Sequence, residues 1–216
     1  MQNPAEHFLT AEEQKHVTEA VRKAELKTSG EIVPMIVSRS HNYPTAAATC
    51  AVSFGLPLAL ATTTVLGEML WIGPQNMWLM LGVFGLLYII FYPLVMKREW
   101  LKKYFLKESQ VTQEVSEGAL AAFYSEQLYK TENENGILLY ISVLEQKVWI
   151  LADRGINEKI DQQEWDSVVT DLTAGIKAGN RCESMCNAVE RIGHILQKHF
   201  PYQKDDQDEL HNLIIR

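Results

Sequence analysis

The sequence predicts an α/β layered domain with a mixed sheet, into which a transmembrane hairpin of two helices is inserted. Its 216 residues are 47% hydrophobic and 22% charged, which is typical of a folded chain and excludes disordered, collagen-like and disulfide-rich proteins. Residues 46–96 contain a single charged side chain, Glu68, and so differ from the polar segments on either side. Those polar segments alternate between helical and strand patterns, which indicates an α/β body.

The first polar segment, residues 1–45, predicts one helix and one strand. Thr10 and Glu13 form a capping-box pattern, and an apolar stripe at helical spacing follows as far as Lys27. Gly30 then ends the helix, and Glu31–Ser38 has the composition of a strand. One helix and one strand bury too little area to fold alone, so this segment must form the first part of a domain that is completed later in the chain.

Two apolar runs predict the membrane-spanning helices within residues 46–96. Ala46–Leu66 and Met77–Met96 contain no charged residue over 21 and 20 residues. A helix needs about 20 residues to cross a hydrocarbon core of about 30 Å, so each run is long enough. The first run is the weaker because of its hydroxyl side chains and Pro57. The alternative is a buried helix of a soluble protein, but such helices seldom lack a polar face over this length.

Basic residues predict the orientation of the hairpin. The connection 67–76 contains the turn signal Gly73-Pro74 and no Lys or Arg. Arg39 precedes the first run, and five basic residues follow the second: Lys97, Arg98, Lys102, Lys103 and Lys107. The positive-inside rule therefore predicts that both termini face the cytoplasm.

The stretch 97–111 is a basic juxtamembrane segment. Basic residues next to a span attract anionic headgroups by about 1 kcal/mol each, so we expect the lipid bilayer to be its partner. Nucleic-acid binding is the alternative. We discount it because residues 108–216 hold far more Asp and Glu than Lys and Arg.

Residues 112–204 predict the second part of the domain. A helix is expected over 112–130, then strands at 137–143 and 148–152 joined by the short turn 144–147, and therefore antiparallel. Two helices follow, one capped by Asp161 and ending near Gly179 and one over 183–199. Residues 205–216 are expected to be an acidic, solvated tail. The first strand then reaches the second through a crossover that contains the whole hairpin.

The three cysteines predict free thiols in a reducing compartment. Cys182 and Cys186 are four residues apart on the last predicted helix, with no second pair to complete a zinc site. A redox or metal role is the alternative.

Three stretches resemble the TPM domain family: Thr28–Pro34, Asn135–Ser142 and Lys147–Ile156. The likeness is greatest to the bacterial membrane subfamily, in which two spans interrupt the domain, and it extends to His199–Pro201 and Asp208–Leu210. The resemblance implies an α/β/α sandwich with a Rossmann-like arrangement in a two-pass protein of the bacterial inner membrane. Some plant relatives are described as acid phosphatases with a bound divalent metal, whereas many bacterial relatives have no assigned activity.

Candidate ligand or metal residues lie at the predicted strand ends. The common phosphate-loop, nucleophile-elbow and zinc-protease motifs do not occur, and we assign no catalytic residue. Arg39 follows the first strand, and Asp153 and Arg154 follow the third. If these ends meet, Asp153 could ligate Ca²⁺ or Mg²⁺ and either arginine could hold a phosphate oxygen. The favoured alternative is a polar turn, because one carboxylate makes a poor metal site.

Two functions follow from these observations. The first is a membrane-anchored binding or assembly module at the cytoplasmic face, which docks a membrane or cytosolic protein. The second is a metal-dependent phosphatase-like enzyme, which rests on the family resemblance and the strand-end residues.

Overall fold

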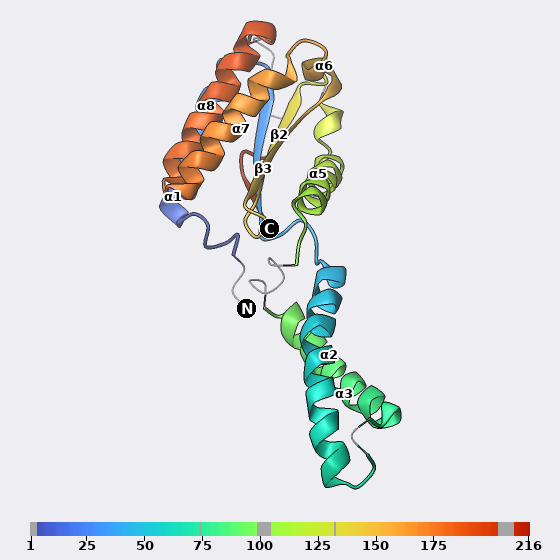
Figure 1. Cartoon of the computed structure of the whole chain (residues 1–216). Helices are drawn as coiled ribbons and strands as arrows, with labels where there is room; N and C mark the ends of the chain where they lie inside the picture. Colours follow the sequence, from blue (N-terminus) through green and yellow to red (C-terminus); the bar gives the residue numbers. More distant parts are fainter. Residues whose placement is uncertain (1–3, 74, 99–104, 132, 203–209) are drawn as a thin grey trace. The chain divides into compact units, whose positions relative to one another are not determined.

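A computed structural model describes residues 4–73, 75–98, 105–131, 133–202 and 210–216. The chain forms two compact units: a body of Met1–His41 with Thr112–Arg216, and a hairpin unit of Asn42–Val111. The segments on either side of the apolar region therefore belong to one body (Figure 1).

The body contains a mixed four-stranded sheet in the order β3-β2-β1-β4, which confirms the predicted α/β class. Strand β1 (Glu31–Val37) runs parallel to β2 (Gly136–Ser142), with Glu31 opposite Gly136 and Val37 opposite Ser142. Strand β3 (Lys147–Ala152) is antiparallel to β2, as the short turn predicted. The short strand β4 (Ile214–Ile215) pairs parallel to β1. The last residues of the expected acidic, solvated tail 205–216 are therefore part of the sheet, where sequence reasoning assigned no strand.

All seven residues of β1 are buried, which explains its nearly continuous apolar sequence. Pro34 lacks an N–H, and the N–H of a residue at this position would point toward β4. Because β4 begins only opposite Met35, no strand partner is lost and Pro34 is tolerated inside this central strand. On that same side the Ile32 N–H donates to Glu25 Oε1 at 3.1 Å, and Ile36 O accepts from the Arg216 N–H at 2.9 Å.

Helices lie on both sides of the sheet and complete three layers (Figure 1). On one side α1 (Ala11–Glu25), α7 (Gln162–Lys177) and α8 (Arg181–His199) form the main core with the sheet. On the other side lies α5 (Glu108–Ser125), which begins four residues before the predicted 112. It is followed by the short 3-10 helix η1 (Leu128–Lys130).

The cap of α1 confirms the predicted capping box. The Thr10 N–H donates to Glu13 Oε2 at 2.7 Å, and the Glu13 N–H donates to Thr10 Oγ1 at 3.3 Å. Asp161 is the N-cap residue of α7, and its side chain accepts from the Gln163 N–H at 3.5 Å.

The hairpin unit consists of α2 (Pro44–Met69) and α3 (Met77–Met96). Both helices are long and apolar enough to cross a membrane by length and composition. The buried face of α2 is made of small residues, which allow a close approach to α3: Ala46, Ala47, Cys50, Ala51, Gly55, Ala59, Thr63 and Gly67. The Asn76 side chain caps α3 by accepting from the Leu79 N–H at 3.0 Å. Residues 99–104 of the basic juxtamembrane segment 97–111 lie outside the described residues.

Candidate functional site

Asp153 and Arg154 form a polar turn at the end of β3. Asp153 is the N-cap of the short helix α6 (Arg154–Asn157), and its side chain accepts from the Arg154 N–H at 2.7 Å. Arg154 Nε donates to Glu158 Oε1 at 2.9 Å, and this hydrogen bond and the nearby negative charge raise the pKa of Arg154. Local bonds within one turn therefore engage both residues.

The sheet does not bring Arg39 together with Asp153. Because β3 is antiparallel to β2, the carboxyl end of β3 lies beside the amino end of β2, and the Asp153 N–H donates to Gly136 O at 2.9 Å. Arg39 follows β1 at the opposite end, where Val37 is in register with Ser142. Carboxyl ends meet at one edge only when the strands are parallel, so the expected shared site of Asp153 and Arg39 does not form.

A divalent metal finds few ligands at the amino end of β2. The buried side-chain oxygens there include Asn135 Oδ1 and Asp153 Oδ2, which have no hydrogen-bond partner, and the carboxylate of Glu31, which begins β1 opposite Gly136. Ca²⁺ normally takes six to eight oxygen ligands, and no group of three His, Cys, Asp or Glu among the described residues could hold a metal ion. The residues present here do not fit the metal that the family resemblance implies. The acidic residues Asp205, Asp206, Asp208 and Glu209 lie outside the described part of the chain.

A buried polar cluster occupies the carboxyl ends of β1 and β2. The Ser40 N–H donates to Glu145 Oε1 at 3.0 Å, and Ser142 Oγ donates to the other oxygen of Glu145. The Tyr140 hydroxyl donates to Ser40 Oγ at 3.3 Å, and burial raises the pKa of Tyr140. Next to this cluster His41 Nδ1 lies 3.3 Å from Glu114 Oε2.

This cluster positions the backbone rather than presenting a nucleophile. Ser142 is 1% exposed and its hydroxyl donates to the Glu145 carboxylate, so this hydroxyl is engaged within the body although Ser142 also contributes to the lining of the pocket described next. Glu145 instead holds Ser40, which lies on the connection from β1 to α2. Sequence reasoning identified the polar residues after the first strand but missed Glu145, whose position in a hairpin turn carries no local signal.

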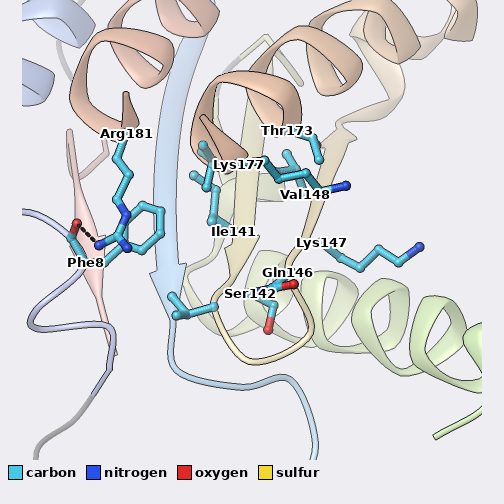
Figure 2. A pocket seen from close by; sticks show the side chains of 11 residues that line it. Phe8, Ile141, Ser142, Gln146, Lys147, Val148, Thr173, Lys177 and Arg181 are labelled. Carbon is cyan, nitrogen blue, oxygen red and sulfur yellow. Dashed lines mark hydrogen bonds between the residues drawn. The ribbon is translucent and has the colours of Figure 1, made fainter. Parts of the chain in front are cut away.

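A pocket of about 320 Å³ lies within the body, at the end of the sheet where the turn connects β2 to β3. Figure 2 shows its lining, which combines an apolar wall with three basic side chains from β3, α7 and the start of α8. The apolar wall includes Ile141, Val148 and Ile176, and the basic residues are Lys147, Lys177 and Arg181.

Arg181 is held in place at one side of this pocket. Its Nη1 donates to Phe8 O at 3.2 Å, and its guanidinium lies 4.9 Å from the centre of the Phe8 ring (Figure 2). None of the lining residues is acidic, although the chain has a net charge of −7. The pocket is therefore chemically suited to an anion. Sequence reasoning missed it because Lys147 is far along the chain from Lys177 and Arg181, and the apolar wall that joins them forms only when α7 packs on the sheet.

Comparisons with known proteins agree with the architecture. Residues 107–195 match the family model described as the TPM domain, a range that contains β2, β3, α7 and most of α8 but not β1. No curated protein matches the chain. The solved NMR structure of the BA42 protein from the psychrophilic bacterium Bizionia argentinensis is similar over 96% of this chain and 94% of its own, with 24% identity and a TM-score of 0.59. This chain therefore has the fold of BA42, and its residues 107–195 carry the likeness to the TPM domain.

Proposed function

We propose that this protein is a membrane-anchored binding module. Its hairpin unit holds the chain in the bacterial inner membrane, and its body binds a ligand or protein partner at the cytoplasmic face. The observation that carries the proposal is the exposed apolar surface of both long helices, together with a body that forms a compact unit of its own.

The exposed side chains of the hairpin unit favour lipid as its surroundings. Val65 is 66% exposed on α2, and Leu86 and Ile89 are 61% and 70% exposed on α3. Leaving such surface in water costs about 25 cal/mol per Å², a cost that a hydrocarbon core removes. Trp71 and Trp78, next to the connection between the helices, are also exposed, and tryptophan is enriched at membrane interfaces.

Binding is favoured over catalysis because the hydroxyl groups at the carboxyl ends of β1 and β2 are engaged within the body. Ser142, Ser40 and Tyr140 bond one another or Glu145. Asp153 and Arg39, which the sequence suggests for phosphatase chemistry, lie at opposite ends of the sheet and share no site. We therefore do not propose the enzymatic alternative.

Compartment-sensitive reporters test the anchoring. Reporters that are active on only one side of the membrane are fused after Ser40 and after Arg216, and a third is inserted after Gly73. The Arg216 fusion needs a flexible spacer, because the Arg216 N–H and C=O bond Ile36 and Ser38. We expect cytoplasmic signals from the first two and a signal from the far side at Gly73.

Two results would contradict this topology. Signals from opposite sides at Ser40 and Arg216 would mean that only one helix spans. Release of the chain from membranes by alkaline carbonate would mean that neither helix does.

A further inference from the structure

We propose that the pocket beside the β2–β3 turn binds a phosphate group, carried either by a small soluble molecule or by a lipid headgroup. This inference rests on the proposed binding function and specifies its ligand chemistry. It is carried by three observations on the pocket: its charge, its apolar wall and its size.

Charge comes from β3 and from the two connected ends of α7 and α8, which meet β3 in the folded body. Lys147 begins β3, Lys177 lies in the last turn of α7, and Arg181 begins α8. No described carboxylate forms an ion pair with Lys177. A phosphate group carries up to two negative charges and several acceptor oxygens, which matches a set of lysine and arginine donors.

The remaining lining fits the part of a ligand that carries the phosphate. Ile141, Val148 and Ile176 supply an apolar wall, and Thr173 adds a neutral hydroxyl beside Lys177 (Figure 2). The volume of about 320 Å³ is at the small end of the range for ligand pockets, about 300–1,000 Å³. It suits a group such as glycerol phosphate rather than a larger nucleotide.

Two sources can supply this group. Soluble phosphomonoesters are one source, and anionic phospholipids are the other. Both sources therefore belong in the test.

The first arm uses the full chain in a neutral detergent and titrates sn-glycerol 3-phosphate by calorimetry, with glycerol as the uncharged probe. The second arm compares thermal unfolding of the full chain in phosphatidylcholine nanodiscs with and without phosphatidylglycerol. We expect saturable binding in the first arm, a higher melting temperature with phosphatidylglycerol in the second arm, or both. Binding of glycerol 3-phosphate alone identifies a soluble ligand, and stabilisation by phosphatidylglycerol alone identifies the headgroup.

Three variants test the pocket itself. Lys177→Gln removes a charge that has no described ion-pair partner, and we expect binding to weaken about ten-fold. Thr173→Phe fills the space without changing charge and should weaken binding similarly. Lys198→Gln makes the same charge change at an exposed position of α8 outside the pocket, and should leave binding unchanged.

Two outcomes overturn the proposal. The first is no saturable binding of glycerol 3-phosphate together with no stabilisation by phosphatidylglycerol. The second is an equal loss of binding in Lys177→Gln and Lys198→Gln, which would indicate diffuse electrostatic attraction. The detergent arm requires no spanning of a bilayer. A failure of the anchoring proposal therefore leaves this arm interpretable, and a failure of the pocket leaves the reporter topology unchanged.

Discussion

The backbone N–H of Ser40 donates to the buried Glu145 carboxylate at 3.0 Å, across 105 residues of sequence. Glu145 lies between β2 and β3, and Ser40 lies between β1 and α2. The bond therefore connects the turn of the antiparallel pair to the segment that leads into the hairpin unit. Ser142 donates to the same carboxylate, so one side chain satisfies donors from two segments.

Replacing Glu145 should destabilise the body. Glu145→Ala leaves the Ser40 N–H and the Ser142 hydroxyl without their acceptor, and hydrogen bonds to charged groups contribute about 1.5–3 kcal/mol each. We expect the free energy of unfolding to fall by about 2–3 kcal/mol in denaturant titrations. Glu164→Ala, at an exposed position of α7, should change it by less than about 0.5 kcal/mol. Similar losses in the two variants would show that the buried bonds contribute little.

Gly136 should not tolerate a side chain. A Cβ at this position would lie 2.6 Å from Leu128 O, which is backbone and has little room to move. We expect Gly136→Ala to lower the free energy of unfolding by about 1–3 kcal/mol, the usual cost of overpacking. A Cβ on Gly85 would meet nothing within 4 Å, so Gly85→Ala is the matched control and should leave the melting of the body unchanged. A neutral Gly136→Ala would contradict the close approach of η1 to β2.

The body should fold without the hairpin unit. Replacing Ala46–Met96 by a flexible Gly/Ser linker alters a loop whose closure costs only about 0.6 kcal/mol per doubling of length. Ile32 and Ile36 of β1 stay buried in the sheet and contribute about 1.5–3 kcal/mol each. We expect a soluble protein that melts cooperatively by circular dichroism.

Deleting residues 1–45 is the informative comparison for that variant. It removes β1 from between β2 and β4, so it breaks the sheet in the middle and should cause aggregation. Equal solubility and equal cooperativity of the two versions would show that β1 is not needed by the body.

Cys186 should be a slow nucleophile in the folded protein. Burial and the neighbouring Cys182 raise its pKa from 9.0 to about 11. At about pH 8 the raised pKa makes the thiolate fraction of Cys186 about two orders of magnitude smaller in the folded chain than in the unfolded chain. Alkylation by iodoacetamide should therefore be much slower in the native chain. Peptide mass spectrometry over time measures both rates. Cys182→Ser should recover only part of the rate, because burial remains, and equal native and unfolded rates would contradict the prediction.

Tyr140 should make stability fall at alkaline pH. Burial raises the pKa of Tyr140 in the folded state, so the contribution of this group to the unfolding free energy is fully present below the unfolded pKa of about 10. Above that pH the unfolded chain releases the proton first, and stability is lost as pH rises through the folded pKa. We expect the loss of unfolding free energy between about pH 8 and pH 11 to be smaller in Tyr140→Phe than in the native chain. An identical loss in both would mean that Tyr140 ionises equally in the two states.

Several elements were predictable because their signals are local. Thr10 and Glu13 are three residues apart, so their capping box is visible in the sequence and forms as expected. The antiparallel pair of β2 and β3 follows from a short turn between two strand patterns. Two elements were not predicted in full: α5 begins at Glu108 rather than 112, and β4 depends on its pairing with the distant strand β1.

The sequence by itself determined the class of the body, the two apolar helices of the hairpin unit and the caps of α1 and α7, since each depends on neighbouring residues and on a fixed period along the chain. Only the tertiary structure decided which polar residues meet. Strand direction separates Asp153 from Arg39, and the packing of α7 and α8 on the sheet brings Lys147, Lys177 and Arg181 to one pocket. The physical reason is that such meetings depend on the order and direction of segments far apart in the chain, and no local pattern records them.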